Sequence, residues 1–470
     1  MSMVEKLALR PITLAGAEVL PLVEGGKGIA VSDGASAGAW AAAGGVGTFS
    51  AVNARIPGQE ELGRLESYKE KLRPRRHAEM IERAIRGGIA QAKIAYETAC
   101  NRGRIHMNVL WEMGGVEEVL HGILSKVKGL IHGVTCGAGM PFRLAEICAK
   151  YNIKYYPIVS SARAFSILWR RAYSKFSEWL GGVVYEDPWL AGGHNGLSTQ
   201  ENETLPEPPE PRVRQLREVM RQVGLPDMVP IFMAGGIWCL SEWTDWIDNR
   251  ELGAVAFQFG TRPLLTVESP IPAAWKQKLL TLRRGDVLLN RFSPTGFPAS
   301  AVKNAFLCDL LARSERQVAY ASAVDDVFTD PLALPNGRLV FVRPVDKERV
   351  AAWQRDGWTV PLPTPSATLV FVSYQQSQEI DNDRRNCIGC LSSCHFSGWQ
   401  QDSSAPVKIM PDPRSFCIQK SLQNIALGDD PEKFLMFCGH QGYRFAEDPF
   451  YANGFIPTVQ QLVDRIGLGL

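Results

Sequence analysis

Between residues 18 and 262, short apolar runs alternate with longer amphipathic stretches. The stretches 78–100, 143–151, 163–178, 212–223 and 242–249 have helical periodicity. The apolar runs between them have the length of buried strands: Val19–Val23, Val46–Phe49, Ile105–Leu110, Gly129–Val134, Tyr155–Val159, Gly182–Tyr185, Ile231–Met233 and Ala254–Phe257. Eight strands that alternate with helices predict a parallel α/β sheet, and eight strands close a (β/α)8 TIM barrel. An open doubly wound sheet is the alternative, although no Gly-x-Gly-x-x-Gly follows the first strand.

The pattern changes after residue 262. Segments 338–342 and 368–373 are predicted strands, and the helical segment 347–356 between them completes a small α/β unit. Five of the ten cysteines then fall between Cys387 and Cys438. We therefore predict three parts: a barrel over 1–265, a helical and loop extension over 266–335, and a small α/β and cysteine-rich C-terminal module over 336–470.

Charge and hydropathy narrow the class of protein. The 470 residues include 51 Lys and Arg against 49 Asp and Glu, and no basic stripe predicts a nucleic-acid partner. No apolar run reaches the roughly 18 residues of a membrane span, and the first 21 residues do not resemble a secretory signal. Ten cysteines fit a reducing compartment. We expect a cytoplasmic protein that acts on a small molecule, without a membrane or nucleic-acid partner; an oligomer stays possible.

Two glycine turns predict a phosphate site. Gly235 and Gly236 follow the seventh predicted strand, and Gly260 and Thr261 follow the eighth, two residues after Gln258. The loops after these two strands of a TIM barrel often bind phosphate through backbone N–H groups, because glycine lets the phosphate come close to the chain. The alternative is two ordinary tight turns.

A third glycine turn carries a histidine. Gly192, Gly193 and His194 follow the sixth predicted strand, on the side of the barrel where reactive groups are placed. An imidazole with an ordinary pKa near 6.5 is a proton acceptor at neutral pH. His194 is therefore the candidate catalytic base, and a merely hydrogen-bonded loop histidine is the alternative.

Two further strand ends are candidates for contact with a flat ring. The first strand ends in Glu24, Gly25 and Gly26, whose glycines would let the backbone pass under the ring. Asn108 ends the third strand and could donate an amide hydrogen bond to a ring carbonyl.

Three motifs together resemble a family. Ala-Gly-Gly-His at 191–194, Met-Ala-Gly-Gly-Ile at 233–237 and Gln-Phe-Gly-Thr-Arg at 258–262 resemble the nitronate monooxygenase (2-nitropropane dioxygenase-like) group of FMN barrels, which also includes FMN-dependent enoyl-ACP reductases. The resemblance covers about 18–265 and implies FMN, with its phosphate at the turns after the seventh and eighth strands. It also implies that His194 stands where the family's base removes a proton from the carbon beside the nitro group. Glu24 departs from the family's apolar residue there and would place a carboxylate close to the ring.

The C-terminal cysteines predict a metal centre. Cys387, Cys390 and Cys394 form a C-x2-C-x3-C run that can hold zinc or a [4Fe–4S] cluster with a fourth ligand. The run resembles the cluster cysteines of the flavin-dependent dienoyl-CoA reductases, in which the fourth cysteine follows sooner. We expect Cys417 as the fourth ligand and iron–sulfur in preference to zinc. Alternatives are Cys438 or His395 as a ligand, or free thiols throughout.

These observations leave three functional hypotheses. The first is an FMN-dependent monooxygenase that oxidises an alkyl nitronate or a similar carbon acid with O2, with His194 as base. The second is an NAD(P)H-dependent flavin reductase of enoyl thioesters or of another acceptor. The third is a phosphate-binding barrel with a structural zinc module and no catalysis.

Overall fold

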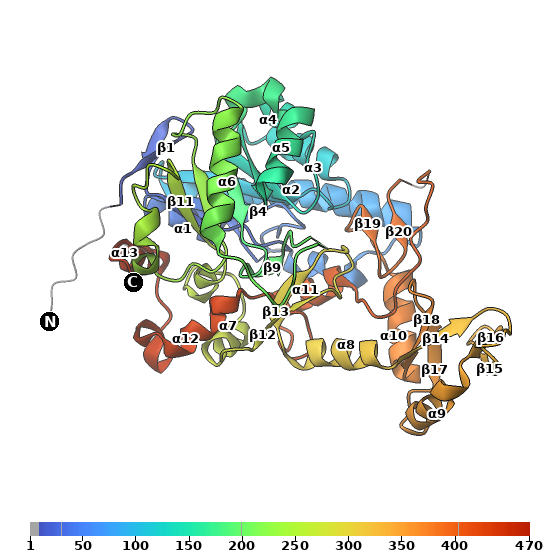
Figure 1. The fold of residues 1–470 in the computed structure, drawn as a ribbon. Coiled ribbons are helices and arrows are strands. Elements are labelled where there is room, and N and C mark those ends of the chain that lie inside the picture. Colours follow the sequence, from blue (N-terminus) through green and yellow to red (C-terminus); the bar gives the residue numbers. More distant parts are fainter. Residues whose placement is uncertain (1–8, 30, 199, 403) are drawn as a thin grey trace.

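A computed structural model describes residues 9–29, 31–198, 200–402 and 404–470. Eight parallel strands close into a barrel with helices around it, so the predicted TIM barrel is confirmed (Figure 1). The strands, in order around the barrel, are β3 (Leu22–Glu24), β4 (Val46–Ser50), β5 (Arg104–Leu110), β6 (Gly133–Gly137), β7 (Lys154–Val159), β8 (Val183–Glu186), β10 (Ile231–Ala234) and β11 (Val255–Phe259). The pairing of Phe257 with Leu22 joins the last strand to the first and closes the ring.

The outer layer of helices follows the predicted periodicity, with shifted boundaries. It contains α1 (Gly34–Ala42), α2 (Arg73–Ala99), α3 (Val116–Leu124), α4 (Leu144–Lys150), α5 (Ala162–Arg171) and α6 (Pro209–Gln222). Segment 242–249, predicted as a helix, corresponds instead to a 3-10 helix, η4 (Leu240–Trp246), with non-helical backbone at Trp243. The fourth predicted strand begins later than expected, at Gly133.

The first predicted strand is two strands in the structure. Pro21 separates β2 (Ala17–Val19) from β3, and proline has no N–H to donate to a sheet ladder. β2 pairs with β1 (Ile12–Leu14) as a hairpin. Leu14 and Val19 of the hairpin are buried in one apolar cluster with barrel residues such as Tyr156 and Phe232. The hairpin therefore packs against the apolar interior of the barrel, which adds to the barrel core.

The extension after the barrel contains a small sheet as well as helices. β12 (Val287–Asn290) pairs with β13 (Ala299–Val302), and β13 pairs with the two-residue strand β9 (Gly193–His194). α7 (Ala273–Leu280) and α8 (Ala305–Glu315) flank these strands in the sequence. The prediction of a purely helical and loop extension was therefore wrong, because the extension supplies the strand that holds the His194 backbone.

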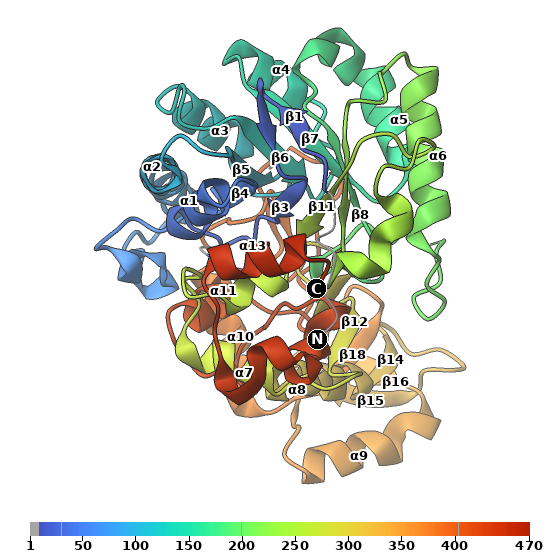
Figure 2. The same cartoon turned by 90° about the vertical axis from the view of Figure 1, so that its left-hand side faces the viewer.

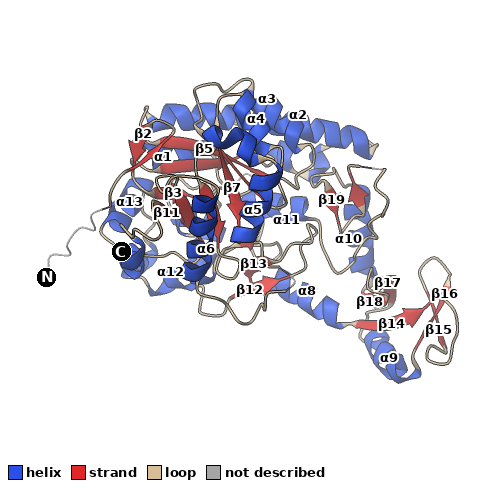
Figure 3. Ribbon diagram, turned by 45° about the horizontal axis from the view of Figure 1, so that its top comes forward, coloured by secondary structure: helices blue, strands red, loops and turns tan. Residues whose placement is uncertain are grey.

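A second sheet projects from the body of the molecule (Figures 1 and 3). Its order is β15 (Asp330–Ala333), β16 (Leu339–Val342), β14 (Gln317–Ala321), β18 (Thr368–Val372) and β17 (Val360–Pro363), and α9 (Lys347–Arg355) lies between β16 and β17 in the sequence. The two predicted strands and the predicted helix are present. The predicted division at residue 335 is wrong, however, because it cuts through this single sheet.

After α10 (Tyr374–Arg385) the chain returns to the barrel. It forms β19 (Ser393–Cys394), β20 (Trp399–Gln400), α11 (Ile418–Ala426), α12 (Arg444–Glu447) and α13 (Val459–Gly467). Figure 2 shows α13 close to α1, and the two helices are in contact. Within the part of the chain that the structure describes, no helix is both long and apolar enough to cross a membrane.

The packing of β4 against α1 gives a test of the fold. A methyl group added at Gly47 would overlap the carbonyl oxygen of Ala37, which is fixed in the helix. We expect Gly47→Ala to lower the free energy of unfolding by about 2–3 kcal/mol, because neither backbone can move aside freely. Gly467→Ala is the matched control, since a Cβ there meets no atom within 4 Å. Equal urea midpoints for the two variants would contradict this packing.

Candidate active site

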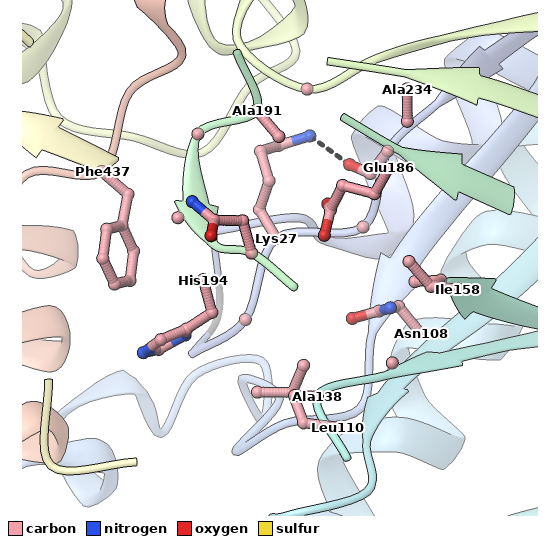
Figure 4. Close-up of a pocket in the computed structure, with 18 of the residues that line it drawn as sticks. Lys27, Asn108, Leu110, Ala138, Ile158, Glu186, Ala191, His194, Ala234 and Phe437 are labelled. Carbon is pink, nitrogen blue, oxygen red and sulfur yellow. Dashed lines mark hydrogen bonds between the residues drawn. The ribbon is translucent and has the colours of Figure 1, made fainter. Parts of the chain in front are cut away.

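A large pocket opens at the carboxyl ends of the barrel strands. Its volume is about 760 Å³, and its walls come from the loops after most of the strands together with parts of the extension and the C-terminal segment. In Figure 4, Glu186 and Asn108 reach into this pocket from barrel strands, and His194 and Phe437 lie on the opposite side. This end of a TIM barrel is where the βα loops build active sites.

The two predicted glycine turns lie side by side in the pocket wall. Gly235 and Gly236 have positive φ angles of 94° and 78°, in the region that favours glycine. A Cβ at Gly260 would meet no protein atom within 4 Å, so its backbone faces open space. The hydroxyl of Thr261 accepts a hydrogen bond from the Gly439 N–H at 2.9 Å, which ties this turn to the C-terminal segment.

Buried Arg262 connects the two turns. Its guanidinium donates to the carbonyl of Trp238, just after the first turn, and to the carbonyl of Leu470 at 3.0 Å. It also lies 3.6 Å from the carboxylate of Asp448. A fully buried guanidinium needs such partners, so the C-terminal segment and the seventh and eighth barrel loops hold each other in place.

His194 lies in the same pocket, and its backbone is part of the β9–β13 ladder. Its Nε2 is 2.6 Å from the Ser293 hydroxyl, and its ring packs edge-on against Phe437 at a centroid distance of 5.2 Å. Burial lowers the pKa of His194 to about 4, since the surroundings disfavour an imidazolium. The ring is therefore neutral at neutral pH.

Asn108 and the first-strand glycines meet at the floor of the pocket. The side-chain amide of Asn108 donates to the Thr135 hydroxyl at 3.2 Å. A Cβ at Gly26 would overlap the Asn108 side chain, so this approach requires glycine. Gly25 lies against Gln258 from the last strand, and both line the pocket. The structure thus brings together every predicted cofactor-contacting residue except one.

Glu24 is that exception. It does not line the pocket, because its carboxylate is buried at the end of β3. The carboxylate accepts hydrogen bonds from Ser36 of α1 at 2.9 Å and from Lys27 at 3.1 Å. Burial raises the pKa of Glu24 even though Lys27 opposes the shift. Lys27 lines the pocket and Glu24 stands behind it, so contact of the Glu24 carboxylate with a bound ring stays a prediction.

Glu186 lines the pocket and was missed in the sequence. Burial, and then the neighbouring Asp187, raise the pKa of Glu186 to about 8, so this carboxyl is mostly protonated at neutral pH. Its position at the end of a strand was the signal that could have found it. Phe437 and Gln419 also line the pocket, but they lie far from the barrel in sequence and carry no local signal.

The four predicted metal-binding cysteines line one separate small cavity: Cys387, Cys390, Cys394 and Cys417. Burial raises the pKa of Cys390, Cys394 and Cys417, which keeps free thiols protonated. Cys438 lies elsewhere, in the wall of the main pocket, where its thiol donates to the carbonyl of Gly439 at 3.4 Å, and His395 is exposed. Among the described residues, no three His, Cys, Asp or Glu side chains form a group that could hold a metal ion. Iron–sulfur and zinc therefore both stay predictions.

The comparisons with known proteins fit this geometry. Residues 133–350 match the model of the nitronate monooxygenase family. The match covers 218 of the 470 residues. The match spans His194 and both glycine turns, and it makes the chain an oxidoreductase. The search of curated proteins found no match.

Three solved structures resemble the fold of the chain. They are FabK from Thermotoga maritima (15% identity, 95% of this chain and 91% of that chain, TM-score 0.50), the enoyl reductase domain of MlnA from Bacillus amyloliquefaciens (12%, 95% and 93%, 0.53), and nitroalkane oxidase from Streptomyces ansochromogenes (19%, 64% and 80%, 0.44). At these identities, the first two support the fold of the chain.

The electrostatics of His194 can be tested without a substrate. Its ring should titrate near pH 4 rather than near pH 6.5, because protonation places a charge in the pocket wall. NMR of protein labelled in its histidine rings measures this, and His194→Asn assigns the signal. Since the unfolded chain binds this proton more readily, His194 should also destabilise the fold as the pH falls from 6.5 to 4. A midpoint near 6.5 would show that the ring is solvated.

Proposed function

We propose that the protein is an FMN-dependent oxidoreductase of the nitronate monooxygenase type, in which His194 is the base. The observation that carries this proposal is a neutral, half-buried imidazole in the same pocket as two adjacent glycine turns. The substrate that we propose is an alkyl nitronate or a similar carbon acid, and the oxidant is O2. Ten free cysteines support the cytoplasm as its compartment.

The pocket suits FMN in size and in its donor groups. A volume of about 760 Å³ holds a cofactor together with a substrate. The phosphate would lie against the backbone of Gly235, Gly236 and Gly260, and a Cβ at Gly260 would meet no protein atom within 4 Å. Gly25, Gly26, Asn108 and Gln258, which line the floor of the pocket, would hold the ring. When bound, FMN supplies two-electron oxidation of the substrate and reaction with O2.

The residues of the chain perform the proton transfer. His194 is neutral over the physiological range, so its free ring nitrogen can accept a proton from an acidic substrate carbon. The Ser293 hydroxyl fixes the plane of the ring and can either donate or accept, which suits both protonation states. Phe437 covers one edge of the ring and limits the access of water.

A second candidate is an NAD(P)H-dependent reductase of an enoyl thioester, and two observations favour it. Protonated Glu186 is a proton donor in the pocket, which such a reduction needs. Much of the pocket wall is also apolar and would suit an acyl chain: Leu110, Met140, Ile158, Leu168, Phe297 and Phe437. Aerobic turnover of propionate 3-nitronate, compared with NAD(P)H oxidation by an enoyl thioester, separates the two candidates.

We infer that the protein also has a second cofactor, a metal centre at Cys387, Cys390, Cys394 and Cys417, with iron–sulfur favoured over zinc. Support comes from the one cavity that all four side chains line. The alternative of a non-catalytic barrel with structural zinc is disfavoured by the oxidoreductase family of residues 133–350.

Replacement of the base tests the proposed chemistry. His194→Asn should lower kcat by about 10²–10⁴-fold while FMN stays bound, because the variant keeps a polar side chain but cannot accept the proton. Turnover and flavin content are measured on the same sample. Ser293→Ala is the comparison and should have a smaller effect, since it removes only the orientation of the ring. Wild-type turnover by His194→Asn would exclude His194 as base.

A side chain placed at Gly260, in the proposed phosphate site, tests whether FMN binds there. Gly260→Val should weaken FMN binding at least about tenfold, because its side chain would occupy the space beside the backbone N–H groups. The protein itself has room for the side chain, so folding should be preserved. Gly467→Val, at the end of α13, is the control with equal room and no pocket contact. Normal FMN content in Gly260→Val would place the phosphate elsewhere.

A further inference from the structure

A lysine ammonium group lies in the wall of the active pocket. Among the described residues that line the pocket, Lys27 is the only lysine or arginine (Figure 4). The two titratable groups drawn with it, His194 and Glu186, are mostly uncharged at neutral pH because both are buried. The carboxylate of Glu112 also lines the pocket, where it accepts a hydrogen bond from Ser392 at 2.6 Å. Lys27 is therefore the cation that a bound molecule would meet.

The backbone of Lys27 is fixed at the carboxyl end of the barrel. Its N–H donates to the Ser32 hydroxyl at 3.0 Å, and its carbonyl accepts from the Ser32 N–H at 3.1 Å. Two residues earlier, the Gly25 N–H donates to the carbonyl of Phe259 at 2.9 Å, which joins this loop to the last barrel strand. The side chain of Lys27 therefore starts from a defined point.

The ammonium group is held in place as well, with one donor left over. It donates to the Gly25 carbonyl at 2.7 Å and to the Glu24 carboxylate at 3.1 Å. An ammonium group has three N–H donors, and no described residue accepts the third. A fixed cation with a spare donor is a suitable partner for an oxyanion, because little freedom is lost on binding.

The ion pair between Lys27 and Glu24 is asymmetric. The side chain of Lys27 is 16% exposed, whereas that of Glu24 is 1% exposed and accepts a hydrogen bond from Ser36 on α1. Burial raises the pKa of Glu24, so the surroundings disfavour its negative charge. Glu24 therefore balances the charge of Lys27 only in part, and from behind the wall.

The phosphate of FMN has other partners in the proposed site. It would lie at Gly235, Gly236 and Gly260, and the buried guanidinium of Arg262 connects these two turns. Lys27 bonds instead to Gly25, one of the residues proposed to hold the ring. A substrate has to reach that ring, so an anion bound at Lys27 fits a substrate better than the phosphate.

We infer that Lys27 binds an oxyanion of the substrate, either a carboxylate or the oxygen atoms of a nitronate group. Its third N–H would donate to that oxyanion, and the pocket would then select anionic substrates over neutral molecules of the same shape. The assignment of this anion to a substrate rests on the proposed function, whereas anion binding in the pocket does not.

Two probes of the same shape test this selection. Hexanoate and hexanamide differ in charge but hardly in size, so their apolar parts make the same contacts. Calorimetry on the protein as purified should give hexanoate a Kd about 10–100-fold lower than that of hexanamide, which is the usual worth of a hydrogen bond to a charged group. Lys27→Met keeps the length of the side chain without the charge and should bind both probes equally. Equal binding by the wild type, or a preference retained in Lys27→Met, would overturn the inference.

Further variants separate the charge from the stability of the fold. Lys27→Met leaves the Glu24 carboxylate buried without its cation, which can destabilise the protein. The double variant Glu24→Gln/Lys27→Met removes both charges and should also bind the two probes equally. Glu24→Gln alone should increase the preference for hexanoate, because it removes the opposing charge beside Lys27. A preference kept by the double variant, or lowered in Glu24→Gln, would contradict the assignment to Lys27.

A lysine in a comparable ion pair provides the matched control. Lys278 of α7 pairs with Glu432 outside the pocket. Lys278→Met should therefore keep the wild-type preference for hexanoate. Loss of the preference in this variant would show that the selection does not come from the pocket.

Flavin measurements on the same samples separate this inference from the proposed function. A preference for hexanoate in wild-type protein that binds no FMN would contradict the proposed function and leave the anion site standing. FMN-loaded wild-type protein without the preference would do the reverse. Lys27→Met should also keep the wild-type ratio of FMN to riboflavin affinity. A ratio at least tenfold lower would show that the charge serves the phosphate, and the assignment to the substrate would then be wrong.

Discussion

The site depends on one short backbone ladder. β13 pairs on one side with Gly193 and His194 of β9, and the C-terminal segment adds to the same strand through the Ala301–Phe437 bridge. The N–H groups of Val302 and Cys438 extend this bonding. Because ladder hydrogen bonds are satisfied only in one register, the pairing sets where the imidazole lies relative to Phe437 and to the barrel. Three segments far apart in sequence thus form one wall.

Burial of the side chains in this wall then sets their protonation states. The same burial acts in opposite directions on His194 and Glu186, which both line the pocket: it keeps His194 without its proton and helps Glu186 to keep one. Both groups are therefore mostly uncharged at neutral pH. Arg262 is buried as well, but it has carbonyl and carboxylate partners. The pocket thus combines a neutral proton acceptor and a neutral proton donor with a fixed positive charge behind its glycine turns.

The local sequence pattern was sufficient to predict the barrel and most of the residues at the carboxyl ends of its strands. Strand runs and glycine turns repeat along the chain with the period of a β/α unit, so Gly235, Gly260 and His194 could be placed at one end of a closed sheet before any coordinates. The strand pattern could not show that the Glu24 carboxylate bonds Ser36 and Lys27, because the contact with Ser36 depends on how α1 packs beside β3. The sheet across residue 335 was missed because β14 and β15 are short and half-exposed.

The contributions of the tail could not be read from local pattern. Phe437 and Gln419 reach the pocket through long-range packing, and nothing in the neighbouring residues indicates it. The cysteine run was different, since the spacing of three thiols is itself a signal. The structure places Cys417, the expected fourth ligand, in the small cavity with these three thiols, and it places Cys438 in the main pocket.

The hydrogen bonds from Arg76 to the loop that contains Cys387 have a consequence for how the protein folds during synthesis. This arginine lies on α2, whereas the carbonyl groups that it binds are about 310 residues later and leave the ribosome long after it. Before those later residues are synthesised, the Arg76 guanidinium can bond only the nearby carbonyls of Glu70 and Lys71 among these partners. The carboxyl end of the nascent barrel therefore stays uncovered until the C-terminal segment has been synthesised. A prematurely terminated chain would keep that opening permanently and would be a natural substrate for chaperones and proteases.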